Sequence, residues 1–152
     1  MIISAAPGIG KSTLAKKYLN IIDLDISTFD VTSKTRIKDY CETAIYLSNQ
    51  GYVVLTGTHK EVLEYFINKD LKDYFIIQFD FCLKQYLLNK LYMRYEESPT
   101  LKHLHAYNGI KKYFDEIVSY IKMLDKNKYY LIENPDYNIE QIVNQIINKE
   151  PE

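Results

Sequence analysis

The hydrophobic positions along this chain switch repeatedly between two spacings. Short apolar runs, rich in Ile, Val and Tyr, alternate with longer stretches in which apolar residues recur every three or four positions. The first pattern is typical of buried strands, and the second is typical of helices with one buried face. The runs that predict strands cover residues 1–4, 21–24, 52–56, 74–79 and 129–132.

The helical spacing predicts the remaining elements. It covers residues 11–19, 35–50, 60–69, 83–95 and 110–124. Asn138 is placed to cap a last helix, and Ser98-Pro99 has the form of another helix start. Asn108-Gly109 is expected to break the chain. The segment 93–109 is the least regular and most polar part, so we expect a mobile lid there.

The predicted strands alternate with helices along the chain, and they do not have polar residues at every second position. This pattern indicates a parallel sheet covered on both faces. The expected fold is therefore α/β, a three-layer α/β/α sandwich around a five-stranded, mostly parallel sheet. The length of 152 residues fits a single domain, residues 1–152.

The composition and net charge of the chain exclude some classes of protein function. Hydrophobic residues make up 47% and charged residues 26%, which is typical of soluble globular proteins. The net charge of -1 does not favour nucleic-acid binding through phosphates. No apolar run approaches the roughly 20 residues that span a bilayer, and the N-terminus lacks the charged region of a signal peptide. Cys41 and Cys82 lack metal-ligand spacing. We expect a cytoplasmic protein without a membrane partner.

One motif carries specific chemistry. Residues 5–13 read AAPGIGKST, which matches the phosphate-loop (Walker A) pattern GxxxxGK[ST] with Ala5 in place of the first glycine. Gly8 and Gly10 permit positive φ, so successive backbone N–H groups can surround an anion. The motif follows an apolar strand and opens a helix, whose positive dipole end lies at Lys11. The motif therefore predicts binding of a nucleoside triphosphate.

The motif also assigns tasks to its side chains. Lys11 is expected to reach the β- and γ-phosphates, Ser12 to offer its hydroxyl to Mg²⁺, and Thr13 to meet the α-phosphate. The predicted cofactors are accordingly ATP and Mg²⁺. The residues predicted to surround the nucleotide are Ala6, Pro7, Gly8, Ile9, Gly10, Lys11, Ser12 and Thr13.

Beyond this motif, nearly the whole chain resembles the small P-loop kinases. That group includes the nucleoside and nucleotide, shikimate, gluconate and 5′-hydroxyl polynucleotide kinases, and the chain is most similar to compact phage P-loop kinase-like proteins. The resemblance rests on the order of GIGKST, DLD after the second strand, VVLTGTH ending the third, FDFCLKQYLLNKLYMRYEE before the lid, and YLIENPDYNIEQIV. It implies a P-loop NTPase fold of the nucleotide-kinase type and ATP-dependent phosphoryl transfer.

The resemblance implies roles for two carboxylates after the second strand. Asp25 would activate the acceptor and Asp23 would support the metal, with the order of these tasks left open. An aspartate at a strand end also commonly caps a turn, which is the alternative interpretation.

The same resemblance places other residues around the transfer site. Arg94 would close over the transferring phosphoryl group, while Arg36 and His59 would border the acceptor. Asn134 lies where the adenine is expected. Arg36 and Arg94 are the two arginines of the chain, whereas nucleoside monophosphate kinases surround two phosphate chains with several. This favours an acceptor with a hydroxyl or a single phosphate.

The end of the third strand departs from many P-loop NTPases. Residues 53–56 run into Gly57-Thr58-His59 without a Walker B carboxylate, which argues against a mechanical ATPase or a GTPase. The leading prediction is a kinase for a small molecule, a nucleoside or nucleotide. The alternatives are a 5′-hydroxyl nucleic-acid kinase and a nucleotide-binding regulatory protein with little turnover.

Overall fold

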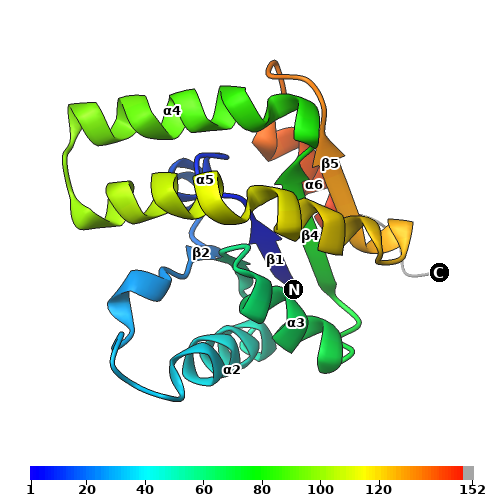
Figure 1. The fold of residues 1–152 in the computed structure, drawn as a ribbon. Coiled ribbons are helices and arrows are strands. Elements are labelled where there is room, and N and C mark those ends of the chain that lie inside the picture. Colours follow the sequence, from blue (N-terminus) through cyan, green and yellow to red (C-terminus); the bar gives the residue numbers. More distant parts are fainter. Residues whose placement is uncertain (149–152) are drawn as a thin grey trace.

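Five strands form one sheet in the computed structural model, which describes residues 1–148 (Figure 1). Every pairing in the sheet is parallel. The predicted α/β class with a largely parallel sheet is therefore confirmed, although the last four residues of the predicted domain 1–152 lie outside the described residues. The strands are β1 (Ile2–Ala5), β2 (Ile21–Asp23), β3 (Val53–Thr56), β4 (Tyr74–Phe79) and β5 (Tyr129–Ile132).

The spatial order of the strands is β2-β3-β1-β4-β5, with β1 in the centre. The chain passes from β1 to the edge strand β2, returns through β3, and then adds β4 and β5 on the other side of β1. Where the winding reverses, the connections leave in opposite directions and open a crevice at the carboxyl ends of the strands. The loop that follows β1 starts at this point.

Helices cover both faces of the sheet, as a three-layer sandwich requires (Figure 1). Leu14, Leu87 and Val143 belong to a buried cluster on one face, while Tyr40 and Phe66 belong to a cluster on the other. None of the helices within residues 1–148 is long and apolar enough to cross a membrane. The helices are α1 (Lys11–Lys17), α2 (Arg36–Asn49), α3 (Lys60–Asn68), α4 (Lys84–Glu97), α5 (Leu101–Lys122) and α6 (Ile139–Ile147).

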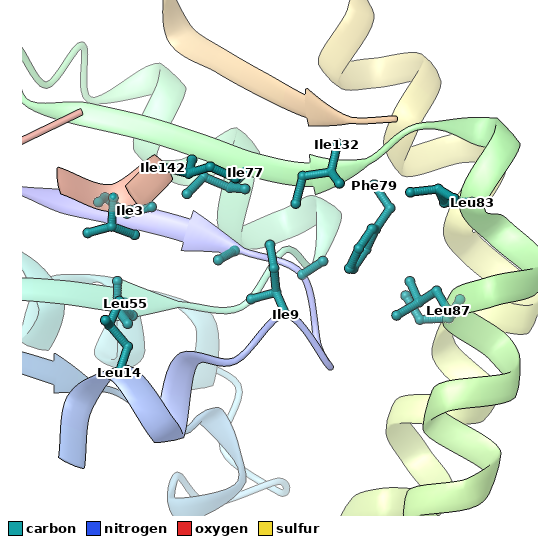
Figure 2. Packing of buried hydrophobic residues seen from close by; sticks show 14 of the residues in the cluster. Ile3, Ile9, Leu14, Leu55, Ile77, Phe79, Leu83, Leu87, Ile132 and Ile142 are labelled. Carbon is teal, nitrogen blue, oxygen red and sulfur yellow. The ribbon is translucent and has the colours of Figure 1, made fainter. Parts of the chain in front are cut away.

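The loop between β1 and α1 is part of the hydrophobic core. Ile9, in the middle of this loop, is 1% exposed and points into the same cluster as Phe79 and Leu87 (Figure 2). The Ala6 N–H donates to the carbonyl of Ile77 in β4 at 3.1 Å. Burial and a hydrogen bond to the sheet therefore hold the loop in place, although its sequence is short and glycine-rich.

The predicted break at Asn108-Gly109 is wrong, because both residues lie inside the continuous helix α5. One glycine in a helix interior costs roughly 1 kcal/mol relative to alanine. Burial of Ile110 and Phe114 on the same helix outweighs that cost, since burying one such side chain contributes about 1.5–3 kcal/mol. The segment 93–109 is thus largely helical, and the expectation that it is irregular is corrected.

The helix caps match the sequence in part. Asn138 caps α6 as predicted, and its side chain accepts a hydrogen bond from the Gln141 N–H at 3.0 Å. The capping position of α5 lies two residues beyond the predicted Ser98 cap. Thr100 fills that position, and its Oγ1 accepts from the His103 N–H at 3.1 Å. A Thr side chain supplies the same capping chemistry as Ser.

Candidate functional site

The loop after β1, residues 6–10, has the backbone of an anion-binding turn and is called the glycine-rich loop below. Gly8 has φ 78° and Gly10 has φ 112°, both in the left-handed region that glycine adopts without strain. Gly10 immediately precedes α1, and its carbonyl accepts the first helical bond from the Leu14 N–H at 3.1 Å. The positive φ angles predicted from the motif are therefore present at both glycines.

Side chains from α4 and from the start of α6 pack tightly around this loop. A Cβ on Gly8 would lie 3.2 Å from Leu91, and one on Gly10 would lie 3.2 Å from Ile139. The Tyr137 hydroxyl donates to the carbonyl of Ile9 at 3.2 Å. Tyr137 was not among the predicted site residues, because an aromatic residue in a loop gives no sequence signal for a hydroxyl contact.

Lys11 is the cation nearest the loop backbone. Its Nζ donates to the carbonyl of Ala5 at 2.6 Å. Burial lowers the pKa of Lys11 to about 8, although the negative charges of Asp23 and Asp25 act in the opposite direction. The ammonium group is thus desolvated and is bound to a neutral carbonyl, an arrangement that favours an incoming anion. Ser12, at the start of α1, is exposed beside it.

Asp23 and Asp25 lie at the carboxyl end of β2. Burial raises the pKa of Asp23, with Lys11 acting against that rise. Asp25 has both carboxylate oxygens engaged: Oδ1 accepts from the Ser27 N–H at 2.9 Å, and Oδ2 lies 2.5 Å from Lys102 Nζ. Burial tends to raise the pKa of Asp25, but the hydrogen bonds from Lys102 and Ser27 hold it below its ordinary value.

Asp25 therefore does what the alternative interpretation expected, since it caps the short 3₁₀ turn Ile26–Thr28. It also lies beside Asp23 and in the electrostatic field of Lys11, because the charges of both aspartates affect the pKa of Lys11. Capping the turn uses one oxygen and leaves the other for Lys102. Asp25 can therefore cap the turn and also take part in a site beside the glycine-rich loop.

Two cations reach this region from the hairpin formed by α4 and α5. The positive charges of Arg94 and Lys102 both lower the pKa values of Lys11 and Asp23. Arg94 comes from the last turn of α4, and Lys102 comes from the first turn of α5. The fold thus brings Arg94 and Lys102 within electrostatic reach of Lys11 and Asp23.

Arg36 and His59 lie on the side of the site next to β3. Arg36 Nη2 donates to the carbonyl of Ile26 at 2.9 Å. Its Nε is the one buried side-chain nitrogen or oxygen in residues 1–148 without a hydrogen-bond partner. Desolvation lowers the pKa of His59, and the charges of Lys11 and Arg36 lower it further. His59 therefore lies within the electrostatic reach of both Lys11 and Arg36.

A tyrosine connects the two strands that carry these residues. The Tyr40 hydroxyl donates to the carbonyl of Leu24 at 2.7 Å and accepts from the Gly57 N–H at 3.1 Å. These contacts join the residues after β2 to those after β3. Tyr40 is fully buried on α2. The sequence indicated only its apolar face, because the helical period does not reveal what a buried hydroxyl contacts.

The end of β3 holds a buried hydroxyl network instead of a carboxylate. The Thr56 and Ser4 hydroxyls lie 2.6 Å apart, and the Tyr74 hydroxyl donates to Ser4 at 2.7 Å. Ser12 and Asp23 are therefore the predicted oxygen ligands for a metal ion. No group of three or more His, Cys, Asp or Glu residues within residues 1–148 could hold a metal. Mg²⁺ commonly binds through one or two carboxylates plus substrate phosphates, so it does not require such a group.

The loop after β5 contains Asn134, the residue predicted near the adenine, and Tyr137, which contacts the glycine-rich loop. The Asn134 side chain is exposed and accepts from the Asp136 N–H at 2.9 Å, which forms a turn. Tyr137, three residues later, makes the contact with the glycine-rich loop.

One surface hollow lies elsewhere. It has a volume of about 570 Å³, follows the polar side of α6, and contains none of the charged residues described above. Its lining consists of Asn138, Glu140, Gln141, Asn144, Gln145 and Asn148. We place the candidate site at the glycine-rich loop because the charged groups and positive-φ glycines converge there, and charge complementarity is what a phosphate ligand requires.

Neither a protein-family model nor a curated protein matches this chain. The resemblance to small P-loop kinases therefore stays a prediction from the motifs quoted above. A functional proposal therefore depends on the chemistry of the residues around the glycine-rich loop.

Proposed function

We propose that this chain is a kinase that transfers the γ-phosphoryl group of ATP to a small acceptor, a nucleoside or nucleotide, with Mg²⁺ as cofactor. The observation that carries the proposal is the convergence of Lys11, Asp23 and Asp25 beside a loop in which Gly8 and Gly10 have positive φ. A nucleotide kinase of the P-loop type needs an anion cradle, a lysine and acceptor-side carboxylates together.

Triphosphate binding is the first step of the proposed reaction. The backbone N–H groups of the glycine-rich loop would cradle the phosphates. Lys11 would exchange the neutral carbonyl of Ala5 for phosphate oxygens, a stronger and charge-assisted contact. Its depressed pKa supports this exchange, because an incoming anion relieves the cost of a desolvated ammonium.

Phosphoryl transfer is the second step. Asp25 would orient the acceptor hydroxyl and take its proton as the new P–O bond forms and the bond to the ADP oxygen breaks. Arg94 would neutralise charge on the equatorial oxygens of the transferring group. Ser12 and Asp23 would hold the Mg²⁺ ion, which supplies further charge neutralisation to the phosphates.

The acceptor would enter between the loops that follow β2 and β3. Arg36 and His59 border this side, and the buried Nε of Arg36 lacks a partner among the described residues. A single guanidinium suits an acceptor with one anionic group, in keeping with the two arginines of the sequence.

A nucleotide-binding regulatory protein with little turnover is the second candidate. The buried contact between Thr56 and Ser4 favours it, because the end of β3 offers neither a carboxylate nor an unengaged hydroxyl to a metal ion. The two candidates share the binding step and differ in the transfer step.

The decisive experiment offers labelled ATP and Mg²⁺ to the protein together with one acceptor at a time. The panel contains nucleosides, nucleotides and 5′-hydroxyl oligonucleotides, and the label on each acceptor is measured. Transfer to a nucleoside or nucleotide is the expected result. Transfer to oligonucleotides alone would favour the nucleic-acid kinase. ATP binding without transfer would favour the regulatory protein, and absence of ATP binding would contradict both candidates.

A further inference from the structure

An ion pair joins the tip of the α4–α5 hairpin to the carboxyl edge of the sheet. Lys102, the second residue of α5, places its Nζ 2.5 Å from Asp25 Oδ2. The other oxygen, Oδ1, is occupied by the Ser27 N–H. Both oxygens of the carboxylate that the proposed transfer requires are therefore engaged in the nucleotide-free chain.

Lys102 also lies within electrostatic reach of the proposed phosphate site. Its charge lowers the pKa values of Lys11 and Asp23, so its ammonium group acts on these two residues as well as on Asp25. The lysine stem is flexible and its head is a compact point charge, which allows it to change partners without a rearrangement of α5. Figure 1 shows α4 and α5 as an antiparallel pair, connected by the short segment that precedes Lys102.

The ion pair is exposed enough to be displaced. The Lys102 side chain is 54% exposed, and that of Asp25 is 29% exposed. Solvent screens such a pair, which therefore contributes little to stability. A triphosphate bound at Lys11 would present several negative oxygens to the same ammonium group and would compete with a single carboxylate.

We propose that Lys102 exchanges partners, holding Asp25 in the nucleotide-free chain and moving to the triphosphate when ATP binds. The exchange frees Oδ2 of Asp25 for the acceptor hydroxyl only after the phosphoryl donor is in place. Lys102 then makes the availability of Asp25 to the acceptor depend on prior binding of ATP, and we call this role the gate. This inference rests on the proposed kinase function, since it assigns an order of events to the same site.

The first test uses the unmodified chain. A carbodiimide forms an amide between a lysine and a carboxylate that touch, and mass spectrometry of the peptides measures the yield. We expect a Lys102–Asp25 cross-link without ligand and a loss of most of it with saturating inorganic tripolyphosphate and Mg²⁺. The Lys60–Glu116 pair, at 2.7 Å on the surface, is the internal control and keeps its yield. An unchanged Lys102–Asp25 yield under saturation would overturn the exchange.

The second test is a double-mutant cycle on tripolyphosphate binding, measured by calorimetry. Lys102→Met is expected to weaken binding about tenfold, the effect of one lost charge-assisted contact. Asp25→Asn is expected to tighten binding several-fold, because it releases Lys102 to the phosphates. In the double variant this gain is lost. Lys111→Met, which removes an exposed lysine from the same helix, leaves the affinity unchanged.

The outcomes separate this inference from the proposed function. If the wild-type chain binds neither ATP nor tripolyphosphate, the kinase proposal fails and the gate fails with it. If binding is present but Asp25→Asn tightens it equally with and without Lys102, the carboxylate acts only through its charge and the gate alone is refuted. Melting temperatures of the four proteins show that each is folded, and the cross-linking result does not depend on the variants.

Discussion

The glycine-rich loop and the tip of the α4–α5 hairpin both face the carboxyl edge of the sheet, but different forces hold them. The loop is part of the core: Ile9 is 1% exposed, and tight packing from α4 and α6 surrounds Gly8 and Gly10. At the hairpin tip, Leu101 is 73% exposed, and the ion pair of Lys102 connects the tip to the sheet.

This difference indicates which part of the site is already formed without ligand and which part can change its contacts. Burial of a large apolar side chain such as Ile9 contributes about 1.5–3 kcal/mol, whereas an exposed ion pair contributes about 0–1 kcal/mol. The proposed phosphate cradle is therefore rigid before ligand arrives. The proposed acceptor side is held by a contact weak enough for a substrate to replace. The predictions below test this contrast, beginning with the largest expected effect.

Lys11→Ala is expected to weaken ATP binding about a thousandfold, because the variant removes the ammonium group from a desolvated phosphate site. Calorimetric titration with ATP and Mg²⁺ measures the change. The melting temperature without ligand should barely move, since the Lys11 head donates a single hydrogen bond within residues 1–148, to the Ala5 carbonyl. Lys16→Ala, an exposed change on the same helix, is the matched control. Equal affinities of the Lys11 variant and wild type would refute the phosphate-loop assignment.

Asp25→Asn is expected to bind ATP at least as tightly as wild type and to slow phosphoryl transfer about 300-fold, within the range typical of a lost general base. The amide keeps the shape of the side chain but cannot accept the acceptor proton. Single-turnover transfer with the best acceptor of the panel measures the rate. Asp30→Asn, in the exposed loop that follows, should leave the rate unchanged. Near wild-type transfer by the Asp25 variant would assign the role to Asp23.

Arg94→Lys is expected to lower the transfer rate at least about 100-fold with little change in ATP affinity, because the contact forms mainly in the transition state. Lysine keeps the charge but lacks the planar fork of arginine. Glu97→Gln, one turn further along α4, is the control.

Hydrogen exchange completes this prediction. We expect residues 93–109 to open readily without ligand and to gain protection with ATP and acceptor. Normal turnover by the Arg94 variant, or full protection of this segment in the ligand-free chain, would contradict the proposed closure of Arg94 over the phosphoryl group.

Two glycine substitutions give the smallest effects and compare the two regions directly. Gly8→Ala is expected to destabilise the fold by about 1–3 kcal/mol, because its φ is positive and its new Cβ would crowd Leu87 and Leu91. Gly109→Ala is expected to stabilise it by about 0.5–1 kcal/mol, because the residue is helical and nothing lies within 4 Å of a new Cβ. Denaturant unfolding of both variants measures the difference. Equal effects would contradict the contrast between loop and hairpin.

Local sequence signals were informative wherever the structure depends on neighbouring residues. The period of apolar positions predicted each strand to within one or two residues, and Asn138 marked the cap of α6. The same reasoning failed at Asn108-Gly109, where turn-forming residues lie in the middle of a helix. The helix continues through these residues because Ile110 and Phe114 are buried. Intrinsic helix propensity is weak in comparison with that burial.

The candidate site likewise contains residues that the sequence predicted and residues that it did not. The glycine-rich loop could be predicted because its conformation follows from the glycines and from the strand and helix on either side. Tyr40 and Tyr137 could not be predicted as site residues, because their hydroxyls contact backbone groups far away in the sequence. A buried tyrosine carries the same apolar signal whether or not its hydroxyl has such a partner.

The sequence by itself determined the alternation of strands and helices, the backbone of the glycine-rich loop and the residue types available for phosphate chemistry. These features depend on interactions between residues close along the chain. Only the tertiary structure decided the strand order that opens the sheet beside β1, the continuity of α5, and the meeting of Lys102 with Asp25. Those features depend on which distant surfaces pack together, and the burial of the whole core determines that choice.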